Sequence, residues 1–520
     1  MGGVEAVATL SHRSIQVLHN HGLTKVRTAF GVSFGEITDN IFFYNNSLQV
    51  VLRALTERLY YVKGPDGFVP CPRPSVSFQT LRYFTTSVVR NMPGHATAWT
   101  AEEFVQSYAG SKAKRYAAAL LNLVRRGARR SFGYLKTFIK AEFYNGTKKK
   151  NPCPRLIQPR SPEYNILIGR YLRPIEKMVY KSIDRVFGHH VVLKCDSAWK
   201  RASHIAQYWG EFRAPCFVGL DASRFDQHVS AEALLYEHDL YNSIYHSEEL
   251  REYLSWQIDN VGFANLPDGA VKYKVEGCRM SGDMNTALGN VFLMCAMTHH
   301  YLINLPPGVH WRFINDGDDC GIFIETEHLH LLSDLPAHHL QYGFEMEVEA
   351  PVYNMEGIEF CQCRPVELAP GKFMMVRNIF KAMAHDWINI RSRNYATFEE
   401  LTVATGRCGL ALYADVPVLS EMYAAMTRFS HREDRVCRIL EEEFSGIGRT
   451  WRMFASAKRD IVVDETCARV SIYKAFGILP DTQRHHEAVF RAFDPFTLPN
   501  PKLPLYSLPT DKIQYFIDRQ

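Results

Sequence analysis

Short apolar runs separated by polar turns dominate the middle of the chain and predict strands. Residues 216–220 form a continuous apolar run that ends on Asp221, which is typical of a buried strand with a carboxylate at its exit. Residues 311–314 and 320–324 are further apolar runs on either side of Asn-Asp-Gly-Asp-Asp. Two runs joined by a glycine-containing turn predict a β-hairpin with an acidic tip.

Other stretches follow helical patterns. Residues 291–303 are mostly apolar and predict a helix that Ser281 or Asp283 could cap. Thr286 and Asn290 are four positions apart and therefore share one face near its start. Toward the C-terminus we predict helices over residues 397–413, 421–444 and 465–476, followed by a proline-punctuated tail over 494–520. The mixture indicates an α+β protein.

Length and composition place the chain among large folded proteins. Its 520 residues are 46% apolar and 22% charged, which suffices for a large core and excludes wholesale disorder. At roughly 150 residues per domain, this length predicts about three domains or one multi-lobed enzyme. We find no apolar run long enough to span a membrane and no secretory signal at the start.

The net charge of +5 conceals an uneven distribution. Residues 111–160 hold fourteen Lys and Arg against one acid, Glu142, and aromatic residues interleave them. The remaining 470 residues therefore carry 5 − 13 = −8. A basic stretch with aromatics suits a phosphate backbone and stacked bases, although charge runs are often plain solvated helix faces.

Several weaker motifs do not indicate a function. The twelve cysteines are scattered, which argues against a disulfide framework. Histidine pairs such as His189-His190 diverge on a helix or strand, so we do not expect them to form a zinc site. Residues 31–35 match Gly-x-Ser-x-Gly by coincidence, since no helix pattern follows. The absence of a Gly-x4-Gly-Lys-Ser/Thr loop argues against a nucleotide-driven helicase.

Two acidic clusters carry the candidate chemistry. Asp221 and Asp226 bracket a turn at the end of the predicted strand, and Asp318 and Asp319 occupy the predicted hairpin tip. Taken alone, such residues are ordinary turn or cap formers. Several carboxylates at one hairpin tip repel one another, however, unless a divalent cation neutralises them.

Taken together these motifs resemble motifs A, B and C of viral RNA-dependent RNA polymerases, and specifically those of the Tombusviridae (carmovirus and tombusvirus type). The order fits: Asp-x4-Asp at 221–226, Ser-Gly-x3-Thr-x3-Asn at 281–290, and Gly-Asp-Asp at 317–319. Further matching strings lie at residues 61–67, 72–74, 138–142, 154–160, 169–176 and 358–362. The resemblance covers roughly residues 30–400 well and the last hundred more loosely.

The resemblance implies a right-hand fold with fingers, an antiparallel palm sheet backed by helices, and a mostly helical thumb. On the sequence this gives an N-terminal extension over 1–30 and a C-terminal tail over 494–520. The regions between them are expected to be fingers with N-terminal elements (31–209), palm with motif A (210–235), a fingers insertion (236–280), palm with motifs B to E (281–366) and thumb (367–493). A tail that enters the cleft to support the first nucleotide is a further hypothesis.

The resemblance also implies roles for individual residues. Catalytic metal ligands would be Asp221, Asp318 and Asp319, holding two Mg²⁺ ions with Mn²⁺ as a substitute. Recognition of the NTP ribose falls to Asp226, Ser281, Thr286 and Asn290, and triphosphate binding to Lys140, Arg155 and Arg160. Contacts with RNA are expected from Lys148, Lys149, Lys150, Gly282, Cys361 and Gln362.

One departure concerns motif D, where many relatives carry a lysine proposed to protonate the leaving pyrophosphate. No lysine occurs between Lys274 and Lys372. We therefore consider His338, His339 or water as the acid, or a step without a dedicated acid.

The implied function is template-directed RNA synthesis for a positive-strand RNA virus, with RNA template and product, NTPs, a viral auxiliary replication protein and host factors as partners. The intact product is expected in the host cytoplasm, in a membrane-associated replication complex, with membrane association supplied by a segment absent from this chain. The main alternative is a non-catalytic RNA-binding replication subunit. A palm-type nucleotide cyclase would not need the basic block, and a serine hydrolase rests on residues 31–35 alone.

Overall fold

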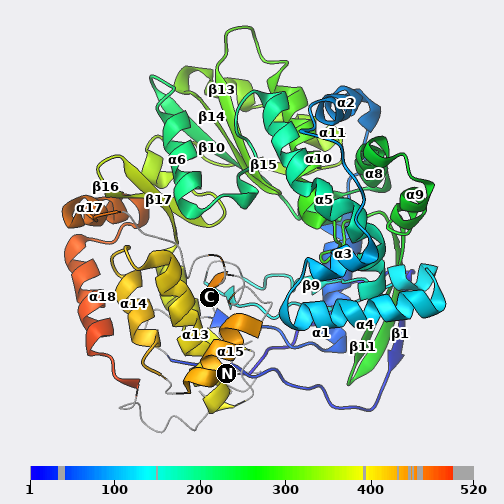
Figure 1. Cartoon of the computed structure of the whole chain (residues 1–520), viewed down its shortest axis with the longest axis horizontal. Coiled ribbons are helices and arrows are strands. Elements are labelled where there is room, and N and C mark those ends of the chain that lie inside the picture. The colour runs from blue at the N-terminus through cyan, green and yellow to red at the C-terminus, as the bar shows by residue number, and fades with distance from the viewer. Residues whose placement is uncertain are drawn as a thin grey trace.

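The structure is a computed structural model that describes residues 2–32, 41–147, 150–390, 394–429, 432–442, 447, 450–451, 453 and 461–495. Lys148, Lys149, residues 33–35 and the tail beyond residue 495 lie outside the described residues, so the predictions made for them stay predictions. The described part mixes helices and strands in both halves of the chain, as an α+β protein requires (Figure 1).

A four-stranded antiparallel sheet lies at the centre of the first core. Its order is β13 (Trp311–Asp316), β14 (Asp319–Glu325), β10 (Pro215–Ala222) and β15 (Met346–Val348). Along β10, Cys216 and Val218 pack into one hydrophobic cluster while Phe217 packs into another on the opposite face. This period of two buries both faces of the sheet.

Helices cover both faces of this central sheet (Figure 1). Residues of α6 (Ala198–Trp209) pack on one face. The opposite face packs against α5 (Pro162–Phe187), α8 (Ala231–Tyr245) and α10 (Thr286–Leu302). The same layer includes α2 (Arg82–Arg90), α9 (Glu248–Ser255) and α11 (Leu335–Gln341). The short α7 (Phe225–His228) follows β10 directly.

The second sheet is built from segments far apart in the sequence. Its order is β1 (Ile15–His19), β12 (Gly269–Glu276), β11 (Asp259–Leu266) and β6 (Leu135–Lys136), and α1 (Leu48–Leu55) packs against it. Two-stranded pairs are β4 (Tyr61–Gly64) with β5 (Gly67–Pro70), β3 (Ile41–Phe42) with β8 (Tyr144–Asn145), and β7 (Phe138–Ile139) with β9 (Leu156–Ile157). Helices α3 (Ala101–Gln106) and α4 (Gly110–Arg126) pack against α5.

The C-terminal part has its own core of helices against the hairpin β16 (Cys363–Ala369) and β17 (Lys372–Arg377). Its helices are α12 (Ile379–His385), α13 (Tyr395–Tyr413), α14 (Leu419–Met426), α15 (Glu433–Glu442), α17 (Glu465–Phe476) and α18 (Pro480–Ala492). Strand β18 (Ile388–Asn389) pairs with β2 (Phe30–Gly31) and joins this part to the N-terminal region.

Most predicted elements are confirmed, with two corrections. The helices predicted over 397–413 and 465–476 are α13 and α17. The single helix predicted over 421–444 is wrong, because α14 ends at Met426 and α15 begins at Glu433. Acidic residues in the first turn of α15, Glu433 and Asp434, favour a new helix start there.

The predicted caps of α10 are also wrong. Asn285 is the N-cap residue of α10 and makes no side-chain capping bond. Neither Ser281 nor Asp283 occupies that position, and the Asp283 carboxylate is instead paired with Arg160.

All twelve cysteines of the chain are free. In the described part of the chain, none of the helices is both long and apolar enough to cross a bilayer.

Candidate active site

The two acidic segments predicted from the sequence meet at one edge of the central sheet. Asp221 on β10 stands directly opposite Asp319 on β14. Asp316 on β13 stands opposite the same Asp319 from the other side. Gly317 and Asp318 form the two-residue turn of the predicted hairpin, and Gly317 has a φ of +100°, which favours glycine. The hairpin and its acidic tip are therefore confirmed.

A cavity of about 1750 Å³ opens beside this edge. Asp221 and Asp318 both line it, as do the basic side chains of Lys140, Lys150 and Arg155. Carboxylates and cations predicted separately from the sequence thus share one cavity. Asp221 and Asp318 come from β10 and the hairpin turn, whereas these three bases come from residues 140–155.

Asp221, Asp316, Asp318 and Asp319 form an acidic cluster at this edge. Their negative charges disfavour one another's ionisation. Burial, together with the negative charges of Asp318, Asp316 and Asp221, raises the pKa of Asp319 to about 6. Oxygen ligands of this kind suit hard divalent cations such as Mg²⁺. Asp221, Asp318 and Asp319 are the residues that could hold such cations, and this remains a prediction.

Two basic side chains that could not be identified from the sequence bind the hairpin through Asp316. Lys194 Nζ donates to Asp316 Oδ1 over 2.7 Å, and Arg201 donates to the other oxygen of the same carboxylate. Lys194 lies just before α6 and Arg201 lies in its first turns. Nothing in their local sequence marks them, since they look like ordinary charged residues at the start of a helix.

Asp226 and Asn290, both predicted to recognise the ribose, are hydrogen-bonded to each other. Asn290 Nδ2 donates to Asp226 Oδ1 over 2.9 Å, and Asn290 Oδ1 accepts from Arg279 Nε over 3.1 Å. Arg279 is in turn paired with the buried carboxylate of Glu237 on α8. The amide of Asn290 is therefore oriented by a buried chain of charges. Burial raises the pKa of Asp226, and the nearby charge of Asp318 adds to the shift.

The remaining residues of the Ser-Gly-x3-Thr segment make local contacts. Thr286 Oγ1 donates to the carbonyl oxygens of Asp283 and Met280 at 3.0 and 3.2 Å. The carbonyl of Ser281 accepts from the backbone of Gln158. Gly282 has a φ of +123°, and a Cβ there would meet the Pro159 backbone at 3.2 Å, so the close approach of these two segments requires glycine.

Lys140 and Arg155 share one carboxylate on the cavity wall. Lys140 Nζ lies 2.9 Å and Arg155 Nη1 3.6 Å from Glu142 Oε2. Both side chains remain substantially exposed, and the two residues are joined by a backbone bond from Lys140 N to Arg155 O of 2.8 Å. They can therefore reach an anion in the cavity together.

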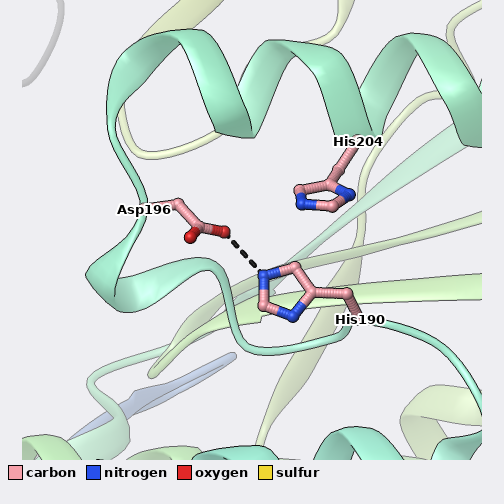
Figure 2. A group of neighbouring side chains, drawn as sticks. All are labelled: His190, Asp196 and His204. Atoms are coloured by element: carbon pink, nitrogen blue, oxygen red, sulfur yellow. Dashed lines mark hydrogen bonds and ion pairs between the residues drawn. The ribbon is translucent and has the colours of Figure 1, made fainter.

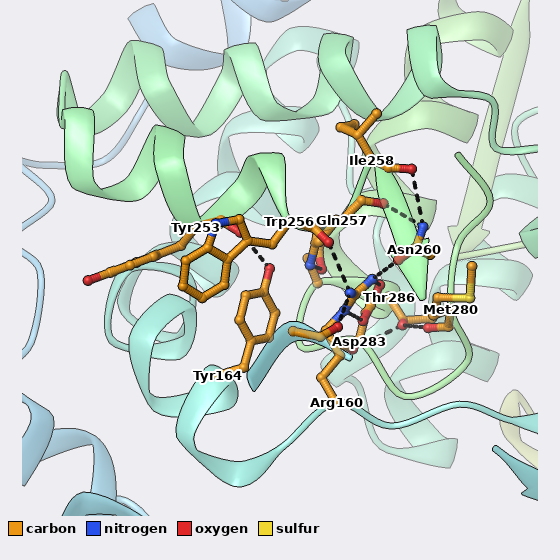
Figure 3. Close-up of polar contacts among 12 residues, drawn as sticks. Arg160, Tyr164, Tyr253, Trp256, Gln257, Ile258, Asn260, Met280, Asp283 and Thr286 are labelled. Atoms are coloured by element: carbon orange, nitrogen blue, oxygen red, sulfur yellow. Dashed lines mark hydrogen bonds and ion pairs between the residues drawn. The ribbon is translucent and has the colours of Figure 1, made fainter. Parts of the chain in front are cut away.

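Arg160, the third residue predicted to bind triphosphate, lies elsewhere. Its guanidinium donates to Asp283 Oδ1 over 2.6 Å, to Asn260 Oδ1 over 2.7 Å and to the Gly133 carbonyl over 2.7 Å (Figure 3). The residue is 1% exposed. A guanidinium that is buried and fully engaged with protein atoms cannot also bind a triphosphate, so this prediction is corrected to a structural role.

Cys361 and Gln362 form a tight turn ahead of β16. Both have positive φ, at +51° and +59°, and Phe360 and Cys363 exchange backbone hydrogen bonds across them. Gln362 lines the cavity and accepts from Lys381 Nζ, while Cys361 Sγ lies 3.5 Å from Asp316 Oδ2. This turn therefore lies beside the acidic edge of the sheet.

His338 and His339 do not lie on the described wall of the cavity. They are on α11, where His338 Nε2 contacts the Met297 carbonyl and His339 is completely buried against Thr298 and the Leu335 carbonyl. Burial lowers the pKa of His339 to about 4, so it is neutral at physiological pH. The hypothesis that either histidine protonates pyrophosphate is wrong, because neither reaches the acidic edge.

Comparison with known proteins places these features in a family. The family described as viral RNA dependent RNA polymerase matches residues 15–495. The chain is 40% identical over 458 residues to an RNA-directed RNA polymerase of Tobacco necrosis virus (strain A). It is 37% identical over 493 residues to that of Pothos latent virus and 37% identical over 453 residues to that of Turnip crinkle virus.

The aligned regions cover most of this chain and a smaller part of each relative. They span 86%, 94% and 86% of this chain, in the same order, and 62%, 65% and 57% of the relatives' lengths. The chain thus spans about three fifths of the length of the curated relatives that it matches.

Proposed function

The chain belongs to the family of viral RNA-dependent RNA polymerases, and we propose that it synthesises RNA on an RNA template from NTPs. In this reaction the 3′ oxygen of the growing strand bonds to the α-phosphorus of an NTP, and pyrophosphate leaves. The observation that carries the proposal is the meeting of Asp221 and Asp318 in one cavity with Lys140 and Arg155. An anionic triphosphate and the metal ions it needs can both be accommodated there.

The carboxylate cluster supports binding of two Mg²⁺ ions, with Mn²⁺ as a substitute. Asp221, Asp318 and Asp319 supply oxygen ligands at one sheet edge, and their mutual repulsion, seen in the raised pKa of Asp319, is relieved by cations. Bound cations would supply charge neutralisation and activation of the attacking hydroxyl. The protein's own contribution is to hold the three carboxylates together on the paired strands β10 and β14 and on the turn that precedes β14.

Basic side chains that line the cavity would bind the triphosphate. Lys140 and Arg155 are exposed, and the Glu142 carboxylate between them holds both near one position. An incoming triphosphate would compete with Glu142 for these two cations, and arginine suits bidentate phosphate contact. Lys150 lines the same cavity and would add positive charge for the RNA or the triphosphate.

Ribose selection would fall to Asp226 and Asn290. Because Arg279 fixes the Asn290 amide, its nitrogen points at Asp226. A 2′ hydroxyl placed between them would exchange this bond for bonds to both side chains, whereas a deoxyribose would leave polar atoms unsatisfied. Thr286 lies one turn earlier on α10 and Ser281 precedes the helix, and both would complete the ribose side of the site after the local bonds of Thr286 are exchanged.

We assign the right-hand organisation as part of the same proposal. The sheet of β10, β13, β14 and β15 would be the palm, the second sheet and residues 31–209 would belong to the fingers, and the helices after β17 would form the thumb. Three predicted boundaries fall inside elements, since the 30/31 boundary cuts β2, the 235/236 boundary cuts α8 and the 366/367 boundary cuts β16. The domain borders should therefore move to the ends of these elements.

The proposed partners are an RNA template and product, NTPs, a viral auxiliary replication protein and host factors. Because the relatives are longer than the matched region, the activity of the whole protein is also part of the proposal. We place the intact product in the host cytoplasm, in a membrane-associated replication complex.

Synthesis from an unprimed template by the purified chain tests this function. With RNA, NTPs and Mg²⁺ or Mn²⁺, the chain should make template-length product, and Asp318→Asn should abolish it while RNA binding persists. Asp334→Asn, an exposed acid before α11, is the matched control and should retain synthesis. Absence of product on every template, with RNA binding intact, would favour the non-catalytic RNA-binding subunit.

A further inference from the structure

Two histidines and an aspartate converge beside α6, away from the acidic edge of the sheet. Their ligand atoms, one nitrogen each from His190 and His204 and one oxygen from Asp196, all lie within 4.8 Å of one another. Figure 2 shows the His204 ring projecting from α6 toward the other two side chains. We propose that His190, Asp196 and His204 bind one Zn²⁺ ion, in a site separate from the acidic cluster.

The fold brings these residues together from one short stretch of chain. His190 lies in the loop after α5, Asp196 immediately precedes the α6 N-cap residue Ser197, and His204 lies two turns into α6. The neighbouring His189 points elsewhere and contacts the Phe313 backbone through Nε2. Adjacent histidines diverge as expected, and the second histidine of the site comes from the helix instead.

Asp184 orients His190 in the manner of an outer partner of a metal ligand. Its Oδ2 lies 2.7 Å from His190 Nδ1, and its Oδ1 accepts from the backbone nitrogens of Val191 and Val192 at 2.8 and 3.0 Å. With Nδ1 engaged by a carboxylate, His190 presents Nε2 toward Asp196. Metal-bound histidines commonly donate their other nitrogen to a carboxylate in this way.

His204 supplies the observation that an ion pair alone does not explain. A protonated His190 between Asp184 and Asp196 would satisfy those three residues. It would leave His204 outside the pair, although the ring of His204 projects toward His190 and Asp196 (Figure 2). The two imidazole rings are 4.5 Å apart between centroids. A zinc ion would take the place of the proton on His190 Nε2, which passes to solvent, and would recruit His204.

The donor set selects the metal. Two imidazole nitrogens and one carboxylate oxygen form a three-ligand zinc set that leaves a position for water. Mg²⁺ prefers oxygen ligands throughout, so it would favour the acidic cluster instead. The three side chains are partly exposed, which allows the ion to enter.

The site would stabilise the segment that supports the Gly317–Asp318 turn. Between His190 and Asp196, Val191 accepts a 2.8 Å backbone bond from Asn315 on β13, and Lys194 pairs with Asp316. Arg201, one turn before His204, pairs with the same aspartate. A metal that joins the loop to α6 would therefore fix the two cations that hold the hairpin.

Metal titration of the purified full chain tests the site without RNA or NTPs. After chelation and dialysis, Zn²⁺ is added in the presence of excess Mg²⁺, and binding is followed by calorimetry and by the shift in Tm. One Zn²⁺ per chain should bind and raise Tm. Asp184→Asn, which keeps an acceptor for the two backbone nitrogens, should weaken binding by roughly 10- to 100-fold. His204→Ala and Asp196→Asn should weaken it further.

Two controls distinguish this site from other ligands. His485→Ala removes an exposed histidine of the neighbouring pair on α18 and should leave binding unchanged. Asp318→Asn should also leave it unchanged, which excludes binding at the acidic cluster. Absence of saturable binding in the folded wild-type chain would overturn the proposal. So would equal affinity in wild type, His204→Ala and Asp196→Asn.

Discussion

Asn290 on α10 donates a 2.9 Å hydrogen bond to Asp226 on α7, the short helix after the strand that carries Asp221. The bond joins two segments 64 positions apart and fixes the spacing between the predicted ribose side of the site and the acidic edge. Its direction is set by Arg279, which occupies the amide oxygen.

We therefore expect Asn290→Ala to reduce discrimination between NTP and dNTP. Loss of one hydrogen-bonding partner for the 2′ hydroxyl should cost about 1–3 kcal/mol, or roughly 5- to 150-fold in the ratio of kcat/KM values. Single-nucleotide incorporation measures this ratio. Asn304→Ala, an exposed asparagine just beyond the end of α10, should leave it unchanged. Equal discrimination in both variants would contradict the role given to Asn290.

Lys194 should act on catalysis through the position of the hairpin. Without its contact to Asp316, the Gly317–Asp318 turn is less constrained, and small displacements of catalytic groups cost about 100-fold in rate. We expect Lys194→Ala to lower kcat by roughly 10- to 100-fold, with little change in KM or RNA affinity. Lys194→Arg should restore most of the rate. Lys200→Ala, exposed on α6, is the control, and a matching kcat loss there would show that any lost charge suffices.

The acidic strand end and the hairpin could be predicted because their signals are local. A continuous apolar run identifies β10, and two runs around a glycine identify β13 and β14. That Asp221 stands opposite Asp319 depends on strand register, which a single sequence does not specify. Here the family resemblance, rather than the pattern, joined the two segments.

Arg160 and Arg155 show where the prediction of a side chain's role from its neighbouring sequence fails. Both lie in one basic stretch and look equivalent in sequence, yet Arg155 lines the cavity while Arg160 is buried against Asp283, 123 positions away. A long-range partner of this kind leaves no local trace. Lys194, Arg201 and Arg279 were missed for the same reason, since their carboxylate partners are distant in the sequence.

Substitution of these two arginines should therefore affect different properties, stability for Arg160 and NTP binding for Arg155. Arg160→Met leaves the Asp283 carboxylate buried without its partner, which should lower the free energy of unfolding by about 3–5 kcal/mol. Arg155→Ala should leave stability nearly unchanged and raise the KM for NTP, because its side chain is 51% exposed on the cavity wall. Urea denaturation and steady-state kinetics measure the two effects. A stable Arg160→Met variant with a raised KM would restore the triphosphate role.

The buried His339 should make stability depend on pH. Its pKa is lowered to about 4 by burial, so between that value and 6.5 the unfolded chain binds a proton that the folded chain does not. Stability from this residue is thus complete above pH 7 and is lost as pH falls, by about 2 kcal/mol at pH 5. Other buried histidines, such as His238, act in the same direction. Denaturant unfolding of His339→Gln between pH 5 and 7.5 should show a shallower pH dependence than wild type, whereas exposed His485→Gln should match wild type. An unchanged slope in His339→Gln would mean that His339 is not buried in its neutral form.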